Sequence, residues 1–227
     1  MTSQRLDQEM VSRALASSRA KAQSLIMEGR VLVDGKPADK PSRKARASQE
    51  IVISGDAKDW VGRGAHKLIA ALDHFELNPA GMIAADIGAS TGGFCEVLLE
   101  RNVQKVYAVD VGHDQLHPSL TGNSKLVNLE GVNAKNLTAD QIADPLDLVV
   151  SDVSFISLTK ALPAALDLCR KGAWLLVLVK PQFEAGRENI GKGGIVRDPA
   201  IAQKVREDME HWIDARAGWR CACRWIS

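Results

Sequence analysis

Residues 82–94 read MIAADIGASTGGF, an apolar run with the composition of a buried strand, followed by a glycine-rich turn. Glycine lets the backbone approach a ligand closely, and a helix that begins after such a turn offers unpaired N–H donors. A second apolar run ends at Asp110, 24 positions after Asp86. An acid in that place can hold both ribose hydroxyls of a nucleoside. The spacing predicts a strand–turn–helix–strand unit that binds a nucleoside.

Further strand-like runs lie at residues 125–127, 146–150 and 174–179, and helical stretches separate them. Continuous apolar strands alternating with helices are typical of a parallel sheet covered on both faces. Ligands bind such sheets at the carboxyl ends of the strands. We therefore expect an α/β fold with a Rossmann-like, mostly parallel sheet.

The turn after the first strand differs from the dinucleotide fingerprint G-x-G-x-x-G of a nicotinamide dehydrogenase. It reads Asp-x-Gly-x-x-x-Gly-Gly, with Asp86 at the end of the strand. A carboxylate there would repel a diphosphate, whereas it suits an aminoacyl group that carries an ammonium. This favours S-adenosylmethionine over a nicotinamide cofactor.

Two charged residues follow later strands, because Asp152 comes after the run 146–150 and Lys180 after the run 174–179. A lysine directly after a buried strand is costly unless it has an acidic partner or a chemical role. One interpretation is a Lys180–Asp152 pair that fixes two strand ends. The other adds Lys67 to form a lysine–aspartate–lysine set, which suits the orientation and deprotonation of a ribose 2′-hydroxyl.

The N-terminal segment differs from the rest of the chain in charge. Residues 1–46 carry 10 Lys and Arg against 5 Asp and Glu, while residues 47–227 carry 19 against 23. This asymmetry favours a module that binds a polyanion, although a solvated lysine-rich surface has the same signature. Apolar spacing predicts helices over 4–15 and 19–28, and Asp34-Gly35 predicts a hairpin turn. We expect a small α+β domain.

A resemblance to a known domain extends over residues 5–36, RLDQEMVSRALASSRAKAQSLIMEGRVLVDGK, which resemble the S-four-type RNA-binding domain. The resemblance implies that basic side chains of the two helices face structured RNA, recognised mainly by shape and phosphate contacts. For each of these side chains a local ion pair is the alternative role. The candidates are Arg5, Arg13, Arg19, Lys21 and Arg30, together with Arg63 outside the domain.

A wider resemblance rests on six motifs: WVGRGAHKL (60–68), DIGASTGGF (86–94), AVDVGHDQL (108–116), SDVSFISL (151–158), LVKPQFEAG (178–186) and GGIVRDP (193–199). Together they resemble the TlyA family, ribosomal RNA 2′-O-methyltransferases with an S-four-type domain and an FtsJ-like catalytic domain. Members of this family are often labelled hemolysins. The resemblance implies a class I S-adenosylmethionine-dependent methyltransferase that acts on cytidine ribose in ribosomal subunits.

The resemblance also implies roles for individual residues. The catalytic set maps onto Lys67, Asp152 and Lys180. The cofactor-binding residues map onto Asp86, Gly88, Ala89, Ser90, Gly92, Gly93, Phe94, Asp110, Val111, Glu130 and Asn133. We expect an RNA-binding domain over residues 1–57, a linker over 58–66 and the methyltransferase domain over 67–227.

The C-terminal end departs from the family pattern. FtsJ-like enzymes use a fourth residue, a glutamate, which TlyA members carry in a G-N-x-E-F-like segment that this sequence lacks. Residues 218–227 predict a sixth strand, without the final antiparallel strand of the family. We therefore expect an incomplete end of the sheet and a weakened activity.

Other functional classes receive less support. The longest apolar run, residues 173–179, is far shorter than a membrane span, the N-terminus does not resemble a signal peptide, and the four cysteines are scattered. These features favour a cytoplasmic protein without a membrane span or a bound metal. Two alternatives stay open beside the methyltransferase: a non-catalytic RNA-binding or ribosome-assembly factor, and, less favoured, a membrane-acting hemolysin.

Overall fold

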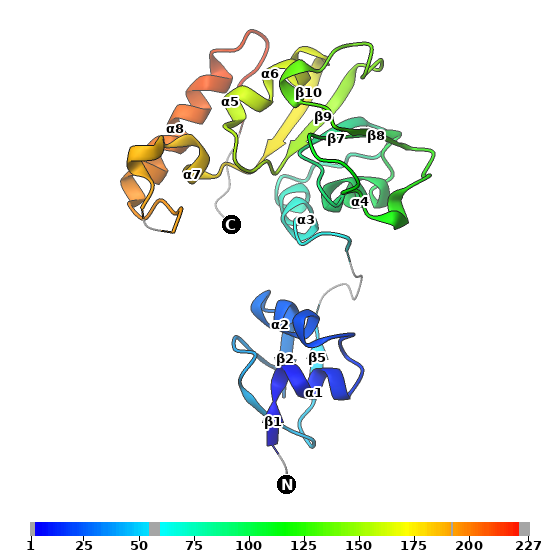
Figure 1. Cartoon of the computed structure of the whole chain (residues 1–227), viewed down its shortest axis with the longest axis vertical. Coiled ribbons are helices and arrows are strands. Elements are labelled where there is room, and N and C mark those ends of the chain that lie inside the picture. The colour runs from blue at the N-terminus through cyan, green and yellow to red at the C-terminus, as the bar shows by residue number, and fades with distance from the viewer. Residues whose placement is uncertain (1–2, 55–59, 192, 223–227) are drawn as a thin grey trace. The chain divides into compact units, whose positions relative to one another are not determined.

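The computed structural model describes residues 3–54, 60–191 and 193–222 (Figure 1). The chain divides into two compact units, residues 1–59 and residues 60–227, which we call unit 1 and unit 2. The division falls inside residues 58–66, the stretch expected to be a linker. Residues 60 and 61 pack against the core of unit 2.

Unit 1 is a small α+β domain, as the sequence predicts. Its elements are β1 (Ser3–Arg5), α1 (Leu6–Ser12), α2 (Arg19–Met27), β2 (Val31–Val33), β3 (Lys36–Pro37), β4 (Lys44–Arg46) and β5 (Ile51–Ile53). Strand β2 lies between β3 and β5 and is antiparallel to both, and β1 pairs with β4. The buried core joins both helices to the β2 strand, through Leu6, Met10, Ile26 and Val31.

Local sequence explains most of these elements. The Ser18 hydroxyl accepts a hydrogen bond from the Lys21 N–H and caps α2, as serine commonly does at a helix start. Asp34 and Gly35 both have positive φ values, 51° and 72°, which a two-residue hairpin turn requires. The first helix is shorter than predicted, because residues 3–5 pair with β4 and α1 begins only at Leu6.

A buried carboxylate ties the two helices of unit 1 together. The Asp7 side chain is fully buried and accepts hydrogen bonds from Arg5 at 2.9 and 2.8 Å and from Gln23 of α2 at 2.7 Å. The guanidinium of Arg19 lies 3.4 Å away. The Arg5 hydrogen bonds hold the pKa of Asp7 well below its usual range, so the carboxylate stabilises unit 1 above about pH 4 and loses this effect as the pH falls.

We predict that Asp7→Ala destabilises unit 1 by about 2–3 kcal/mol, because it leaves the half-buried Gln23 amide and the inner face of Arg5 without their acceptor. Hydrogen exchange of peptides from residues 6–33 measures this loss as a faster opening. Asp39→Ala is the matched control, since Asp39 is exposed. Equal exchange rates in the two variants would contradict the role of Asp7.

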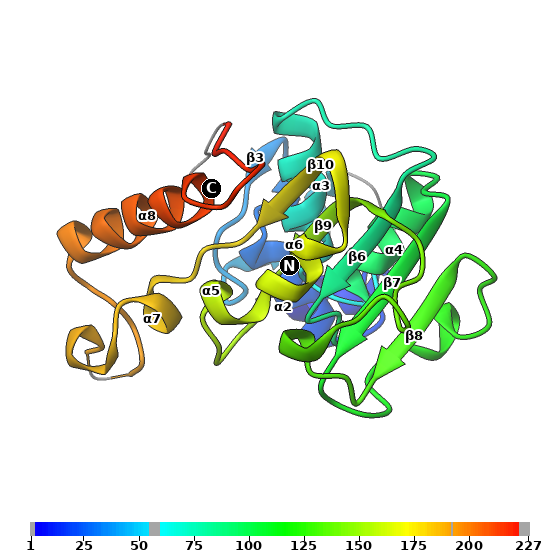
Figure 2. The same cartoon turned by 90° about the horizontal axis from the view of Figure 1, so that it is seen from above.

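Unit 2 contains a parallel sheet with helices on both faces. Its strands are β6 (Ile83–Ile87), β7 (Lys105–Asp110), β8 (Leu126–Glu130), β9 (Leu146–Ser151) and β10 (Cys169–Val177). Its helices are α3 (Ala65–His74), α4 (Gly93–Glu100), α5 (Leu158–Ala161), α6 (Pro163–Asp167), α7 (Pro181–Glu184) and α8 (Pro199–Asp214). The strand order is β10-β9-β6-β7-β8, and every pairing is parallel (Figure 2). The predicted Rossmann-like α/β fold is confirmed.

Alternate residues of each central strand face opposite layers. In β6, Ala84 packs with α3 and α4, whereas Ala85 packs with α5, α6 and α8. In β9, Val150 packs with the α3 and α4 layer, and Val149 packs with the layer of α5, α6 and α8. Because both faces are covered, the central strands are mostly apolar, which is why they could be recognised in the sequence.

The predicted sixth strand is absent from the part of residues 218–227 that the structure describes. Residues 218–222 form no strand, and residues 223–227 lie outside the described part of the chain. In the described sheet β10 is therefore an edge strand, and its Trp174 is 46% exposed. Strand β10 also begins earlier than predicted, with an irregular register between Cys169 and Trp174.

Candidate functional site

The carboxyl ends of three neighbouring strands place three carboxylates at one edge of the sheet. Asp86 lies in β6, Asp110 ends β7, and Asp152 follows β9. Lys180 follows β10 on the other side of β9, with only Leu178 and Val179 between. The parallel topology thus brings together residues that are up to 94 positions apart in the sequence.

Asp152 is held between two lysines. The Lys180 amine lies 2.6 Å from Asp152 Oδ1, and the Lys67 amine of α3 lies 3.1 Å from Oδ2. Lys180 also donates to the Asp152 backbone oxygen at 3.1 Å and to the Ser154 hydroxyl at 2.8 Å. Lys67 reaches solvent with about half of its side-chain surface, whereas Lys180 is 20% exposed. We call Lys67, Asp152 and Lys180 the trio, and the sequence prediction that they lie together is met by this geometry.

The glycine-rich turn over residues 88–93, which we call the cradle, packs closely against the loops beside it. Gly88 and Gly92 have φ values of +84° and +89°. A Cβ atom on Gly88 would lie 2.7 Å from Val153, and one on Gly92 would lie 2.4 Å from Leu120. The residues Ala89, Ser90, Gly93 and Phe94 complete this turn and the start of α4.

Asp110 ties the glycine-rich turn to the loop that follows β7. Its Oδ2 atom accepts from the Ser90 N–H and its Oδ1 atom from the Gly112 N–H, both at 2.8 Å. The neighbouring Val111 is 70% exposed and presents an apolar surface next to this carboxylate. A planar group could pack on Val111 while Asp110 exchanges its N–H partners for hydroxyls.

Glu130 and Asn133, also predicted to bind the cofactor, shape the neighbouring loops. The Glu130 carboxylate accepts the N–H groups of residues 114, 115 and 116 at 3.0–3.1 Å, and these bonds lower its pKa. The Asn133 side chain accepts from the Lys135 N–H at 3.1 Å. Their role in the structure is to hold the loops beside Asp110.

Residues before α3 dock on the glycine-rich turn. The Val61 N–H donates to the Glu96 carboxylate of α4 at 2.7 Å. A Cβ on Gly93 would lie 3.1 Å from the Gly62 oxygen, and one on Gly62 would lie 2.8 Å from the Thr91 hydroxyl. Part of the expected linker therefore forms one wall of the cradle.

Two aromatic residues beside the trio were not predicted as site residues. Phe155, three residues after Asp152, is 92% exposed with a φ of +66°, which is rare for a bulky residue. Its ring contacts that of Phe183 in α7, with centroids 5.3 Å apart. The motif SDVSF contains the phenylalanine, but no feature of the sequence reports its exposure or its backbone conformation.

Glu184 does not join the trio. Its carboxylate accepts from the Ser157 hydroxyl at 2.5 Å and from the Leu158 N–H at 2.8 Å, and so caps α5. Among the described residues, no glutamate is hydrogen-bonded or ion-paired to Lys67, Asp152 or Lys180.

The predicted RNA-binding residues of unit 1 fall into separate groups. Arg13 bonds to Glu9 and to the backbone oxygens of residues 46, 47 and 49 at 2.7–3.0 Å, so it holds the fold together. Arg5 and Arg19 flank Asp7. Arg63 belongs to unit 2 and is exposed.

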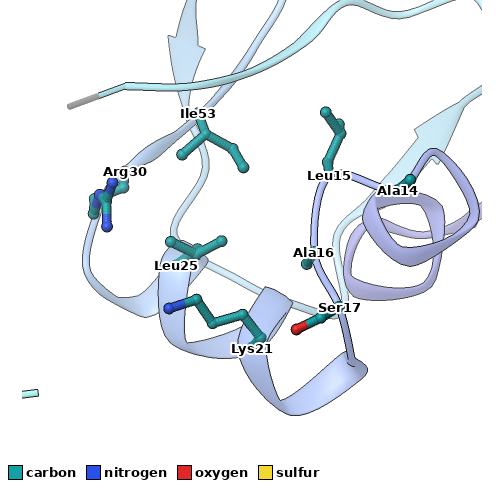
Figure 3. Close-up of a pocket in the computed structure, with 8 residues that line it drawn as sticks. All are labelled: Ala14, Leu15, Ala16, Ser17, Lys21, Leu25, Arg30 and Ile53. Carbon is teal, nitrogen blue, oxygen red and sulfur yellow. The ribbon is translucent and has the colours of Figure 1, made fainter. Parts of the chain in front are cut away.

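Lys21 and Arg30 line a hollow on unit 1 (Figure 3). Leu15, Leu25 and Ile53 form the apolar part of its lining, and residues 14, 16 and 17 complete the lining. Figure 3 shows the Lys21 amine and the Arg30 guanidinium on the same side, flanking Leu25. The Arg30 guanidinium also donates to the Ser54 backbone oxygen at 3.3 Å and lies 3.9 Å from the Glu28 carboxylate.

Comparison with known proteins identifies the family to which the chain belongs. The profile of FtsJ-like methyltransferases matches residues 60–224, and that of the S4 domain matches residues 4–51. The chain belongs to the FtsJ-like methyltransferase family. The methyltransferase fold of this family implies a methyl donor of the S-adenosylmethionine type.

Individual relatives of this FtsJ-like methyltransferase carry two kinds of name. The 16S/23S rRNA (cytidine-2'-O)-methyltransferase TlyA of Mycobacterium tuberculosis is 44% identical over 94% of this chain and 83% of its own length. Hemolysin A of Brachyspira hyodysenteriae is 39% identical over 88% of this chain and 84% of its own length. A solved structure of a hemolysin-named protein from Streptococcus thermophilus has a TM-score of 0.67 at 38% identity, covering 94% of this chain and 79% of that one.

Two further features of this FtsJ-like methyltransferase concern membranes and metals. Within residues 3–54, 60–191 and 193–222, no helix has the length and apolar character needed to cross a membrane. The same ranges contain no group of three or more His, Cys, Asp or Glu side chains arranged to hold a metal ion.

We predict that Gly92→Ala destabilises unit 2 by about 2 kcal/mol more than Gly122→Ala, because only the first substitution overpacks the turn. Both glycines have positive φ, 89° and 79°, but a Cβ on Gly122 meets no atom within 4 Å. All five tryptophans lie in residues 60–227, so their fluorescence during urea unfolding reports on this unit. Equal losses in both variants would show that backbone strain alone matters there.

Proposed function

We propose that this protein transfers a methyl group from S-adenosylmethionine to the 2′-hydroxyl of a cytidine in ribosomal RNA. The observation that carries the proposal is the trio, in which one carboxylate bridges two ammonium groups beside the glycine cradle. Its TlyA relative in Mycobacterium tuberculosis is named for this reaction. Ribosomal subunits as substrate place the enzyme in the cytoplasm.

The residues around the cradle suit S-adenosylmethionine. Gly88 and Gly92 adopt the positive φ values that shape the cradle, Asp110 offers a carboxylate for ribose hydroxyls, and exposed Val111 offers a surface for adenine. When bound, this cofactor supplies an activated methyl group on a sulfonium. The protein therefore has to orient the acceptor hydroxyl and handle its proton.

The trio can both orient the acceptor 2′-hydroxyl and take part in the removal of its proton. The two ammonium groups stabilise the negative charge that develops on the 2′-oxygen, because they lie fixed on either side of Asp152. Asp152 is the one member with lone pairs for the hydroxyl proton, which leaves to solvent past exposed Lys67. Ser154 and the Asp152 backbone oxygen hold the Lys180 amine in place.

We predict that Lys180→Ala lowers the rate of methyl transfer by about 100-fold or more, while S-adenosylmethionine still binds. Labelled cofactor, unmethylated ribosomal subunits, nuclease digestion and mass spectrometry detect 2′-O-methylcytidine. Lys160→Ala is the control, since Lys160 is an exposed lysine of α5. A Lys180→Ala variant that still methylates would overturn the proposal. If the wild type transfers no methyl group and the variant still binds ribosomal subunits, the non-catalytic RNA-binding factor is favoured.

Phe155 is well placed to stack on a base of the target RNA. Its ring is exposed within three residues of Asp152, and a base has an apolar face that aromatic rings bind. The positive φ costs on the order of 1 kcal/mol or more, a strain that persists where the surrounding structure imposes it. We infer that Phe155 and Phe183 hold the target nucleotide so that its ribose faces the trio.

We predict that Phe155→Gly lowers kcat/KM for ribosomal subunits by about 10-fold or more, corresponding to one lost stacking contact. The same variant should be as stable as the wild type, because glycine relieves the positive φ. Phe155→Tyr should retain most of the activity. If Phe155→Gly methylates as the wild type does, the ring has no part in RNA binding.

Unit 1 supplies a second contact with RNA in this proposal. Its S4 domain match and the Lys21–Arg30 hollow support a role in binding ribosomal RNA. Arg13 differs from these residues, because its N–H groups bond within unit 1 and its loss would unfold the module rather than remove a phosphate contact.

A further inference from the structure

Asp86 differs from the other two carboxylates at the edge of the sheet. Asp152 has two lysines, and Asp110 accepts two backbone N–H groups in solvent-exposed loops. Asp86 lies between them on the central strand and is 1% exposed. Among the described residues, no Lys, Arg or His side chain forms an ion pair with Asp86.

The hydrogen-bond partner of Asp86 is a buried thiol. Cys95 Sγ of α4 lies 3.1 Å from Asp86 Oδ2, and the Cys95 backbone N–H also bonds to the carboxyl group. Burial raises the pKa of the Cys95 thiol, so the thiol stays protonated and donates. The other charged groups that act on Asp86 are Asp110 from β7 and Asp152 from β9, and Asp152 is neutralised by Lys67 and Lys180.

A carboxylate buried without a cation is costly, and it therefore tends to hold a proton. Burial raises the pKa of Asp86 to about 7, and the Cys95 hydrogen bonds partly oppose this rise. Near neutral pH the protonated and ionised forms are both populated. A cation that binds close by would favour the ionised form.

We propose that Asp86 couples binding of the cationic methyl donor to the loss of its own proton, and that Cys95 is the positioning residue that sets this coupling. This inference rests on the proposed function, since Asp86 is the next-to-last residue of β6, the strand that leads directly into the cradle. With its ammonium protonated, S-adenosylmethionine carries a net charge of +1, and the product after methyl transfer has lost the sulfonium charge. Asp86 thus distinguishes donor from product by charge.

The direction of the pH effect follows from this linkage. Below about pH 7 Asp86 is mainly protonated, so donor binding must expel a proton and is weakened. Above it the carboxylate is already ionised and the donor binds with full affinity. We expect the wild type to bind the donor about 5-fold more tightly at pH 7 than at pH 6, with a smaller change for S-adenosylhomocysteine.

Isothermal titration calorimetry of the full chain tests the inference directly. Titrations at pH 6 and 7 in two buffers with different ionisation enthalpies give the number of protons released with each ligand. Wild type should release more protons with S-adenosylmethionine than with S-adenosylhomocysteine, and Asp86→Asn should lose this difference. Comparison with Asp86→Asn also cancels the titration of the ligands themselves. Asp144→Asn is the control, because Asp144 bonds to Lys105 and Tyr107 of β7.

Substitutions of Cys95 give a second measurement that keeps Asp86 in place. Cys95→Ala removes a donor to the carboxylate and should move the midpoint of the pH profile upward, while Cys95→Ser should restore or lower it. Identical midpoints in all three proteins would show that Cys95 has only a packing role. Donor binding without proton release in the wild type overturns the inference alone, whereas failure to bind either ligand overturns the proposed cofactor.

Discussion

The site depends on one constraint, the parallel direction of all strands in the sheet of unit 2. Parallel strands end at the same edge, so each polar residue that follows a strand faces the same ligand. Asp110 ends one strand, Asp152 and Lys180 each follow another, and Asp86 is the next-to-last residue of a fourth. Helices cover both faces of the sheet, so these four charged side chains gather at its carboxyl edge.

Each of the three carboxylates at that edge has a different set of partners, and we infer a different function for each. Asp152 is an ion-pair bridge, Asp110 is a hydrogen-bond acceptor between loops, and Asp86 is buried beside a thiol. In the proposed function these three carboxylates serve chemistry, nucleoside binding and proton linkage. Their environments, rather than their identities, separate these roles.

The fold and the trio could be predicted because their signals are local in the sequence. Apolar runs that end in Asp or Lys mark strand ends, and the Asp34-Gly35 turn marks a hairpin. Other features depend on distant partners. Arg13 resembles an RNA contact until backbone oxygens of residues 46–49 are seen around it, and the exposure of Phe155 depends on a backbone conformation that no pattern encodes.

The close approach of Gly62 to Gly93 has a consequence for how this protein can change over time. Each position lacks a side chain because the other chain segment occupies that space. A larger residue at either position would therefore need a compensating shift in both segments. Substitutions at these two glycines should therefore occur together, and the segment before α3 and the glycine-rich turn should change in sequence as a pair.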